Sequence, residues 1–167
     1  MMQHLPAIYI LIRFFVIAGI VLALDMVTKQ MALSTIFATG QPVQVTPFLN
    51  FAPVWNEGVS FGLFADYPQI TNMVVPVFAL FVIGWLITEL TESGWVQQIG
   101  AGLICGGANG NIVDRFRFNK VVDFIDVHVA GLHWPAFNIA DASIFIGVIL
   151  WLYAMMFLNV AGDTEQD

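Results

Sequence analysis

Long apolar runs restrict what this chain can fold into. A helix needs about 20 mostly apolar residues to cross the hydrocarbon core of a bilayer, and the runs at residues 7–24, 71–90 and 139–158 are close to that length. Of the 167 residues, 59% are hydrophobic and only 10% are charged, whereas ordinary globular chains carry about 25% charged residues. A soluble domain of this size cannot bury so much apolar surface. Residues 1–167 are therefore predicted to form a single integral-membrane domain.

A fourth apolar run, at residues 96–113, is weaker because several polar amides interrupt it. Its main feature is a set of three glycines spaced by four residues, Gly102, Gly106 and Gly110. Residues at this spacing share one face of a helix, and small residues on one face allow close helix–helix approach in lipid. We therefore expect a membrane all-α fold with four transmembrane helices.

The first run also has some features of a cleaved signal peptide, since residues 14–24 form a short apolar core. Asp25 follows that core directly, and no small-x-small cleavage site lies beside it. A retained helix is therefore favoured. Arg13, the single charge within the run, is long enough to carry its guanidinium toward the nearer headgroups.

The connections between the predicted helices differ in length. Four spans put both chain ends on one side of the membrane, and the two long connections, residues 25–70 and 114–138, lie on the other side. In the first connection, strand-like stretches at residues 43–45 and 48–54 are bounded by turn residues, a pattern typical of short antiparallel strands. A small antiparallel sheet is thus expected at the membrane surface within residues 40–68.

Positive charges gather on the side of the long connections, where Lys29, Arg115, Arg117 and Lys120 lie. The positive-inside rule would place that side in the cytoplasm. The net charge of the chain is −7, and the sequence contains no basic stripe. Both features argue against nucleic acid as a partner.

Two aspartates stand in polar islands within very apolar sequence. Asp123 lies in the island at residues 121–126, and Asp141 lies in the island at residues 137–143, which leads directly into the last apolar run. An ionised carboxylate is costly at such a boundary, so each aspartate is a hypothesis for a functional residue. Asn138 and Asp141 also have a structural interpretation as helix N-cap and first-turn residue, but Asp123 has no equivalent explanation.

Paired carboxylates would define a specific chemistry. Two carboxyl groups within hydrogen-bond reach do not both ionise readily, so one keeps a proton near neutral pH. The ionised member can remove a proton from a water as that water attacks a carbonyl, and the protonated member polarises the carbonyl. This reaction requires no metal and no covalent intermediate. Asp126 competes with Asp123 for the role, although we expect it to be a surface acid.

Other chemistries receive little support. His4, His128 and His133 are too scattered for a zinc-binding helix, and the last two are expected in an interfacial loop. Ser60 has no apparent base nearby and is expected in a turn. The single cysteine, Cys105, excludes an internal disulfide and is predicted to be a small packing residue.

The end of the weaker run carries polar residues that allow two interpretations. Asn111 and Asp114 would share one helical face, and Arg115 follows directly. On spacing alone, Asn111 is either a helix-end polar group or a contact to a site. Asp114 and Arg115 form either a local charge pair or part of the same site.

Five segments of the chain together resemble the lipoprotein signal peptidase family, also called signal peptidase II. They comprise residues 25–29, 55–62, 106–115, 121–126 and 137–141, in the order that the family has them. Each segment alone would be weak evidence. Five in order, together with the hydropathy profile of four spans, are specific.

The resemblance implies an aspartic endopeptidase of the bacterial inner membrane that acts without a cofactor. Its substrates would be prolipoproteins, cut just before a diacylglyceryl-modified cysteine. The family's fold has four transmembrane helices, cytoplasmic termini and a small extracytoplasmic sheet with a short surface helix. Its orientation is opposite to that given by the positive-inside rule. Membrane lipids are the other expected partners, and we expect a monomer.

The resemblance also implies roles for individual residues. Asp123 and Asp141 take the positions of the catalytic pair. The supporting and substrate-orienting positions are Asn56, Asn111, Arg115 and Asn138, and those with an expected structural role are Asp25, Lys29 and Asp114. Asn109 and Ala142 depart from the family's pattern without removing a catalytic residue. Large apolar side chains in the loops are expected to cover the bound substrate: Phe48, Phe51, Trp55, Phe61, Phe64 and Trp134.

Two other classes of function fit parts of the sequence. A small proton-coupled carrier also uses intramembrane aspartates, but it would need acids near mid-span and an internal repeat. A non-enzymatic assembly protein would use the glycine face to bind a partner helix and would tolerate loss of Asp123 or Asp141.

Overall fold

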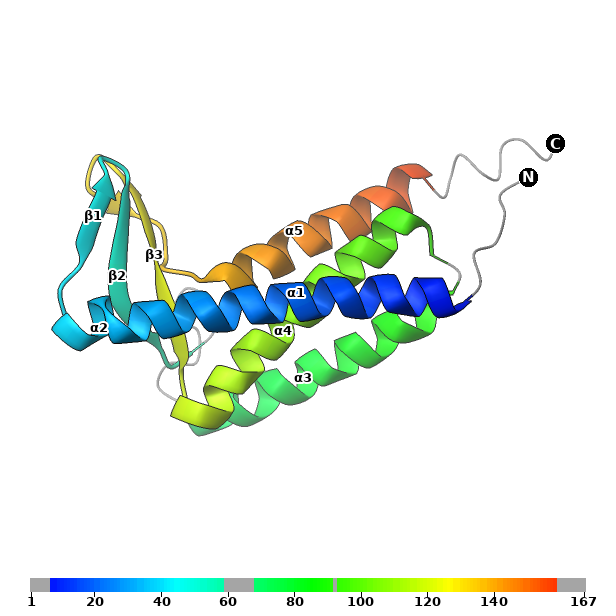
Figure 1. Ribbon diagram of the computed structural model, residues 1–167, viewed down its shortest axis with the longest axis horizontal. Coiled ribbons are helices and arrows are strands. Elements are labelled where there is room, and N and C mark those ends of the chain that lie inside the picture. Colours follow the sequence, from blue (N-terminus) through cyan, green and yellow to red (C-terminus); the bar gives the residue numbers. More distant parts are fainter. Residues whose placement is uncertain (1–6, 59–67, 92, 159–167) are drawn as a thin grey trace.

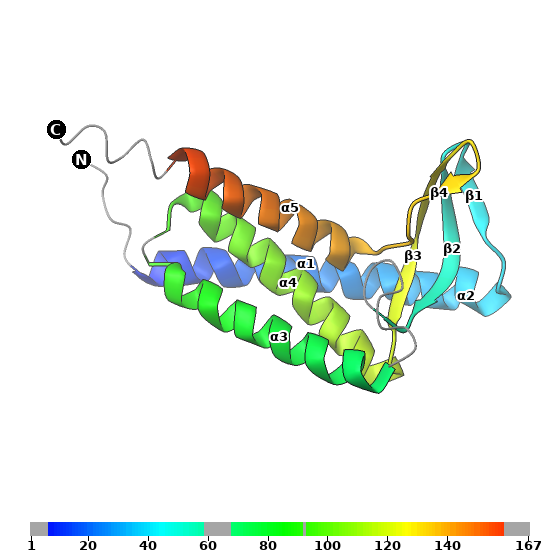
Figure 2. The same ribbon diagram turned by 180° about the vertical axis from the view of Figure 1, so that it is seen from behind.

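Four long helices lie side by side, and a small sheet crosses one end of them (Figures 1 and 2). The computed structural model describes residues 7–58, 68–91 and 93–158. The long helices are α1 (Ala7–Ser34), α3 (Pro68–Glu89), α4 (Trp95–Phe118) and α5 (Ile139–Tyr153). A short helix, α2 (Ile36–Thr39), follows α1, and a π-helical turn, η2 (Ala154–Leu158), extends α5. Both ends of the described chain lie away from the sheet.

Three of the helical stretches in the described part of the chain are long and apolar enough to cross a membrane: Ala7–Thr39, Thr71–Glu89 and Ile139–Leu158. Their outward faces carry large apolar side chains that the protein leaves uncovered. Phe78, Phe81 and Phe145, for example, are 64%, 72% and 68% exposed. Such surfaces are stable in lipid but not in water. The chain is therefore a membrane protein, as the composition predicted.

Helix α4 corresponds to the weaker apolar run and lies among the other helices. Most of its residues are buried, so protein rather than lipid surrounds its polar amides, and it needs less hydrophobicity than its neighbours. The three spaced glycines all face α1: a Cβ at Gly102 would meet Ile17, one at Gly106 would meet Ala18, and one at Gly110 would collide with the Asp25 carboxylate. The prediction of a close helix contact at this face is confirmed.

Two other features of α4 follow from its close packing. Gly100 faces Gly147 of α5, where a Cβ on either residue would lie 2.7 Å from the carbonyl oxygen of the other. Cys105 is buried and unpaired, as its predicted packing role requires. Asn109 donates to the carbonyl oxygen of Cys105 at 2.8 Å, so the polar group that departs from the family's pattern is satisfied within its own helix.

The predicted end of the first helix is wrong. The sequence placed it at Leu24, before the charged residue Asp25, whereas α1 continues to Ser34. The helix continues because Asp25 and Lys29 lie four residues apart on one face and form a buried ion pair with a separation of 2.8 Å. Opposite charges at this spacing support a helix. Helix α4 likewise extends five residues beyond its predicted end at Val113.

The sheet has four antiparallel strands in the order β1-β2-β3-β4. Strands β1 (Val43–Thr46) and β2 (Leu49–Asn56) lie in the predicted region, whereas β3 (Val121–Val129) and β4 (Leu132–His133) come from the connection between α4 and α5. The expectation that residues 40–68 form the whole sheet is therefore wrong. Strand β2 is shared by two partners, and its pairing with β3 brings segments far apart in the sequence together.

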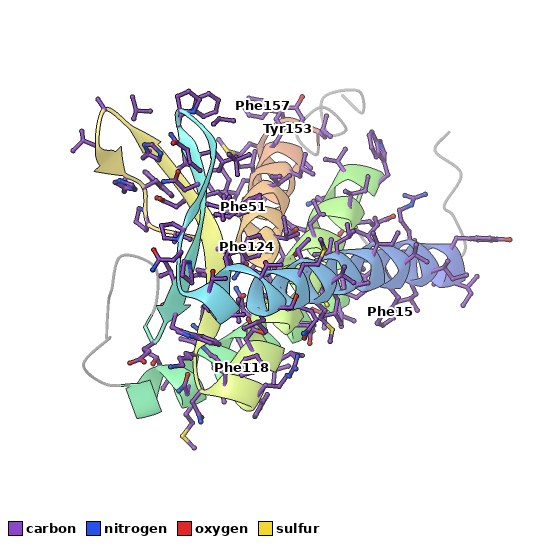
Figure 3. All side chains as sticks on the ribbon, turned by 60° about the vertical axis from the view of Figure 1, so that its left-hand side comes forward. Phe15, Phe51, Phe118, Phe124, Tyr153 and Phe157 are labelled. Atoms are coloured by element: carbon purple, nitrogen blue, oxygen red, sulfur yellow. The ribbon has the colours of Figure 1, made fainter. Side chains whose placement is uncertain are left out.

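Aromatic contacts link strands of the sheet to each other and to the helices; Phe51, Phe124 and Phe118 are labelled in Figure 3. The rings of Phe51 on β2 and Phe124 on β3 lie edge to face at 6.1 Å. Trp55 packs between Phe37 of α2, at 4.9 Å, and Phe118 at the end of α4, at 5.6 Å. Trp55 is thus occupied in joining elements, and its predicted role as a cover for substrate is not supported by this position.

His128 and His133 form a stacked pair on a hairpin. The expectation of an interfacial loop is wrong, because the two residues face each other across β3 and β4 with ring centroids 4.8 Å apart. The turn between the strands uses Ala130 and Gly131, both with positive φ. This is the backbone geometry of a tight hairpin. The sequence did not reveal the hairpin, because Ala130-Gly131 is not one of the usual pairs of turn residues.

Candidate functional site

Asp123 lies near the start of β3, opposite Val54 of β2, and is 1% exposed. Each of its carboxylate oxygens accepts one hydrogen bond from a side-chain amide. Asn138 donates to Oδ1 at 2.7 Å, and Asn56 donates to Oδ2 at 2.9 Å. The strand thus presents the carboxylate toward the start of α5, which explains the acid that had no structural interpretation in the sequence.

Asp141 lies in the first turn of α5 and is half-buried. Its Oδ1 accepts from Nδ2 of Asn111 at 2.7 Å, and its Oδ2 accepts from the backbone N–H of Asn138 at 3.2 Å. The side chain of Asn138 in turn accepts from the backbone N–H of Asp141 at 2.9 Å. The predicted N-cap is therefore confirmed, in the reciprocal form of a capping box.

Asn138 links the two aspartates. Its side-chain nitrogen donates to Asp123, and its backbone nitrogen donates to Asp141. The residue is 0% exposed, so no solvent competes for these bonds. The same side-chain nitrogen lies 3.1 Å from Oδ1 of Asn111. Asp123, Asn138, Asn111 and Asp141 therefore form one network, drawn from β3, the loop before α5, α4 and α5.

The environment of Asp123 favours its protonated form. Burial is the main cause, and the neighbouring negative charge of Asp141 adds to it, so that the pKa of Asp123 rises to about 7. The amide donors Asn56 and Asn138 oppose the rise without cancelling it. A carboxyl group of this kind keeps a proton at neutral pH beside a second carboxylate, which is the arrangement needed for acid–base work.

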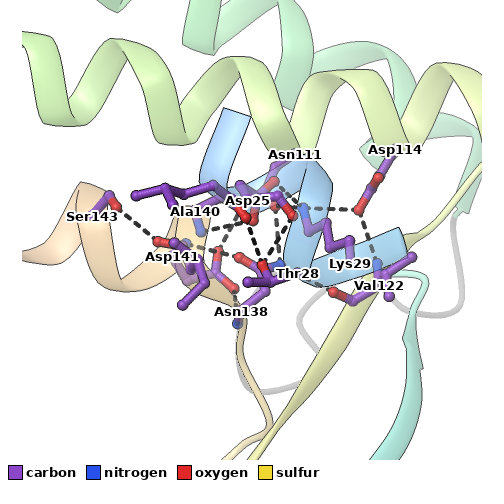
Figure 4. Close-up of polar contacts among 12 residues, drawn as sticks. Asp25, Thr28, Lys29, Asn111, Asp114, Val122, Asn138, Ala140, Asp141 and Ser143 are labelled. Atoms are coloured by element: carbon purple, nitrogen blue, oxygen red, sulfur yellow. Dashed lines mark hydrogen bonds and ion pairs between the residues drawn. The ribbon is translucent and has the colours of Figure 1, made fainter. Parts of the chain in front are cut away.

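A second buried network adjoins the first (Figure 4). The ammonium of Lys29 lies 2.8 Å from Oδ2 of Asp25, 2.9 Å from Oδ2 of Asp114 and 3.0 Å from Oδ1 of Asn111. Asn111 and Asp114 do share one face of α4, as predicted. Asn111 contacts Asp141 directly, so the interpretation of Asn111 as a mere helix-end group is wrong.

Arg115 connects the site to the end of β2. Its Nη2 donates to the carbonyl oxygen of Gly58 at 3.0 Å, and the backbone N–H of Gly58 donates to Oδ1 of Asn56 at 3.0 Å. Arg115 and Asn56 thus hold the same backbone segment, and Asn56 also reaches Asp123. The interpretation of Asp114 and Arg115 as a local charge pair is not supported, because the carboxylate of Asp114 bonds to Lys29 and to the backbone N–H of Val122 instead.

Two cavities open beside Asp141. One, of about 390 Å³, lies between α3, α4 and α5 and is lined by Asn56, Asn111, Arg115 and mainly aliphatic side chains. The other, of about 570 Å³, lies under the segment that joins β4 to α5 and includes Trp134. Asn56, Asp141 and Phe145 line both cavities. A ligand with two apolar arms on either side of a polar group would fit this arrangement.

Phe145 is a wall residue that the sequence analysis missed. It lies four residues after Asp141, so it falls on the same face of α5. That spacing was a usable signal. Of the residues predicted to cover a substrate, Trp134 lies on a cavity wall, whereas Phe61 and Phe64 lie outside the described residues. Ser60, expected in a turn, also lies outside them.

Asp126 belongs to a separate cluster. It accepts from Asn50 at 2.9 Å, and its other oxygen lies 2.7 Å from Nδ1 of His133. Burial alone would raise the pKa of Asp126, but the contacts with His133 and Asn50 outweigh it and hold the pKa below its ordinary value. The expectation of a surface acid is wrong, because Asp126 lies on β3 and is 9% exposed, but its partners separate it from Asp123. No group of three metal-ligating side chains gathers within the described ranges.

Comparison with known proteins identifies the family. The family model described as signal peptidase (SPase) II matches residues 17–157. The chain belongs to the signal peptidase II family. Relatives named lipoprotein signal peptidase include one from Desulforapulum autotrophicum, 35% identical over 154 residues that cover 90% of this chain and 95% of the relative. Another, from Aquifex aeolicus, is 40% identical over 149 residues that cover 87% and 86%.

Solved structures agree with the family. One described as a bacterial membrane enzyme is 30% identical, covers 92% of each chain and superposes with a TM-score of 0.73. A second with the same description is 31% identical, covers 86% of this chain and 92% of its own, and has a TM-score of 0.72. As a member of the signal peptidase II family, the chain is a membrane-bound protease of lipoprotein processing.

Proposed function

We propose that the protein is an aspartic endopeptidase that removes signal peptides from diacylglyceryl-modified prolipoproteins, cutting before the modified cysteine. The observation that carries this proposal is the pairing of the buried Asp123 with Asp141 through Asn138. Both carboxylates are supplied by one chain, so a monomer is sufficient for the reaction. Family membership supports the class of substrate.

Each aspartate has a distinct role in the proposed mechanism. Asp141 lies at the N-terminus of α5, where the helix dipole favours an ionised carboxylate, and it acts as the general base. Asp123 keeps the proton, because burial raises its pKa to about 7. A water between them loses a proton to Asp141 as its oxygen attacks the scissile carbonyl carbon, while Asp123 donates its proton to the carbonyl oxygen.

Collapse of the tetrahedral intermediate completes the reaction. The proton held by Asp141 passes to the leaving amine of the modified cysteine, the C–N bond breaks, and a proton from the intermediate returns to Asp123. Throughout the reaction, Asn111 donates to Oδ1 of Asp141 and Asn138 donates to Oδ1 of Asp123. These two hydrogen bonds hold the carboxyl groups in place. Because these donors are fixed before the substrate arrives, they cost no reorganisation during the reaction.

The position of the site suits a substrate embedded in lipid. Asp141 lies at the end of a membrane-crossing helix, and Asp123 lies on the sheet that crosses the same end of the bundle. The two cavities beside Asp141 have mainly apolar walls, as a diacylglyceryl group and an apolar signal peptide require. A proton-coupled carrier would need acids nearer mid-span, which disfavours that alternative.

We place four spans in the membrane, including α4, with the sheet and the site on the periplasmic side of the inner membrane. The conflict with the positive-inside rule weakens once the cations are located. Lys29 is buried between two carboxylates, and Arg115 is buried against Gly58. Neither presents a free charge to a membrane surface, so Arg117 and Lys120 remain as the cations that count on this side.

A cleavage assay tests the proposal. The purified protein in detergent or lipid discs is given a synthetic prolipoprotein peptide whose cysteine carries a diacylglyceryl group, and products are identified by mass spectrometry. We expect cleavage on the amino side of that cysteine. Asp123→Asn and Asp141→Asn should each reduce kcat by at least about 10³-fold. Cleavage by either variant at the wild-type rate would overturn the assignment of the pair.

Asp126→Asn is the matched control, because Asp126 lies on the same strand three residues from Asp123 and belongs to a different cluster. It should cleave at the wild-type rate. The same peptide without the diacylglyceryl group tests the substrate class, and equal turnover of both peptides would contradict it. A carrier or an assembly protein would release no peptide from either substrate.

A further inference from the structure

Lys29 is a buried cation beside the site that takes no direct part in the proposed reaction. It lies on α1, is 3% exposed, and directs its ammonium to three acceptors: Asp25, Asp114 and Asn111. An ammonium has three N–H donors, so each acceptor can receive one of them. A buried charge with this complete set of partners is retained at a cost in desolvation, which calls for a reason beyond packing.

The two carboxylates around Lys29 hold the backbone beside the two aspartates. Oδ1 of Asp25 accepts from the backbone N–H of Ala140 at 2.9 Å, and Ala140 directly precedes Asp141. Oδ2 of Asp114 accepts from the backbone N–H of Val122 at 3.1 Å, and Val122 directly precedes Asp123. A single ammonium therefore joins the anchors of both aspartates.

The third contact of Lys29 orients a side chain within the site. Oδ1 of Asn111 accepts from Lys29 at 3.0 Å. An amide that accepts through its oxygen must direct its NH₂ group the other way, and Nδ2 of Asn111 accordingly donates to Asp141 at 2.7 Å. Reversal of this amide would place an oxygen against the Asp141 carboxylate. Because the ammonium has no acceptor capacity, Lys29 excludes the reversed orientation.

We propose that Lys29 is a positioning residue of the peptidase site, which sets the separation of Asp123 and Asp141 through Asp114 and Asp25 and fixes the donating orientation of Asn111. This inference rests on the proposed function, since it assigns a role within the same reaction. It differs from a purely structural role in that the loss of Lys29 changes the chemistry even when the helices stay packed.

The charged and titratable groups near this position come from four elements. Asp25 lies on α1, Asp114 and Arg115 on α4, Asp123 on β3 and Asp141 on α5. Burial dominates the raised pKa of Asp123, and the positive charge of Lys29 opposes it. Removal of that charge therefore favours the protonated form of Asp123 further, so the alkaline limb of the pH–kcat profile moves to higher pH.

Lys29→Met is the test, assayed with the diacylglyceryl peptide. Displacement of a reacting group by about 1 Å can cost about 10²-fold in rate, and we expect a loss of kcat of that size with KM within about threefold of the wild type. The alkaline limb should move to higher pH. Arg13→Met is the matched control: Arg13 is also a cation of α1 that bonds to α4, through Gln98 at 2.8 Å, but at a distance from the site.

The controls separate the possible results. If Lys29→Met melts at a lower temperature but keeps the wild-type kcat and pH profile, Lys29 is only structural and the inference is wrong. If Lys29→Met does not fold, Lys29→Met with Asp114→Asn replaces it, since the double change keeps the net charge of the cluster. The double variant should show the same loss of kcat, and an unchanged kcat there would overturn the inference.

Failure of this inference is distinct from failure of the proposed function. A wild-type protein that does not cleave the modified peptide contradicts the function itself. A wild-type protein that cleaves, together with a Lys29→Met variant that cleaves equally well at every pH, contradicts the role of Lys29 alone. The Arg13→Met variant should match the wild type in kcat in both cases.

Discussion

The side-chain nitrogen of Asn138 lies 2.7 Å from Oδ1 of Asp123, although the two residues are 15 positions apart and belong to a loop and a strand. The same residue caps α5 through its side-chain oxygen. One amide therefore serves two functions: its oxygen starts the helix that carries Asp141, and its nitrogen holds Asp123. The two functions can be separated by substitution.

Asn138→Ser should separate capping from the contact to Asp123. Serine is as good an N-cap as asparagine, but its shorter side chain cannot also reach Asp123. We expect a melting temperature close to that of the wild type and a loss of kcat of about 10²-fold, the lower end of the range for loss of a single preorganised donor. Asn138→Ala should lose both functions, with about 1 kcal/mol less stability. A serine variant with full activity would contradict the role of the amide nitrogen.

The pH dependence of cleavage should report the proton on Asp123. Because the pKa of Asp123 is raised to about 7 and the reaction needs the protonated form, kcat should fall about tenfold for each pH unit above that value. Asn56→Ala removes a donor that favours the ionised form. Its alkaline limb should therefore move to higher pH, even though its kcat at neutral pH is lower.

Asn50→Ala is the control for that shift. Asn50 lies on the same strand as Asn56 and also donates to an aspartate of β3, but that aspartate is Asp126. The pH–kcat profile of the Asn50 variant should superimpose on that of the wild type. If the alkaline limb moved by the same amount in the Asn50 and Asn56 variants, a general effect on the strand, and not the hydrogen bond to Asp123, would explain the shift.

The raised pKa of Asp123 also predicts how stability depends on pH. Between pH 3.8 and about 7 the unfolded chain has lost this proton and the folded chain still holds it, so the contribution of Asp123 to stability falls as pH rises. Above about pH 7 the loss is constant, and it amounts to at most about 4 kcal/mol, since one pH unit corresponds to about 1.4 kcal/mol.

Asp123→Asn should remove this dependence. Relative to the wild type, the variant should gain melting temperature between pH 4.5 and pH 8, because asparagine has no proton to lose. Asp126→Asn should show no such gain, since the pKa of Asp126 is lowered and not raised. A difference between the Asp123 variant and the wild type that stays constant across this range would contradict the raised pKa.

The glycine face of α4 predicts a large packing effect. A Cβ at Gly106 would lie 2.6 Å from the carbonyl oxygen of Ala18 and 2.7 Å from Cβ of Val21, so α1 and α4 must separate to accept it. Gly106→Ala should cost about 2–3 kcal/mol, measured as a lower melting temperature in detergent. Gly84→Ala on α3 meets no atom within 4 Å and should be neutral or stabilising by up to about 1 kcal/mol.

Much of the fold follows from local sequence signals. The apolar runs identify α1, α3 and α5 because burial in lipid depends on composition more than on partners. The spacing of Gly102, Gly106 and Gly110 identifies the face of α4 that meets α1, and Asn138 marks the start of α5 since an N-cap acts within one turn. The cytoplasmic or periplasmic position of the ends rests on the proposed orientation.

Tertiary contacts decided the rest. The sequence could not show that α1 continues through Asp25. The helix can continue because Lys29 pairs with Asp25 and also with Asp114, which lies on another helix and 89 positions after Asp25 in the chain. Nor could it show that β2 pairs with β3, since strand partners are chosen by long-range register. Because of that register, Asp123 accepts a hydrogen bond from Asn138, whereas Asp126 contacts His133.

The sequence by itself thus determined the class of the protein and its apolar helices, which depend on residue type and on spacing within one element. Its resemblance to the signal peptidase II family, and not local physics, implied most of the residues of the candidate site. Only the tertiary structure decided which polar groups meet: Asn138 between Asp123 and Asp141, and Lys29 between Asp25, Asp114 and Asn111. Buried polar groups require partners, but in a folded chain those partners come from whichever element packs alongside.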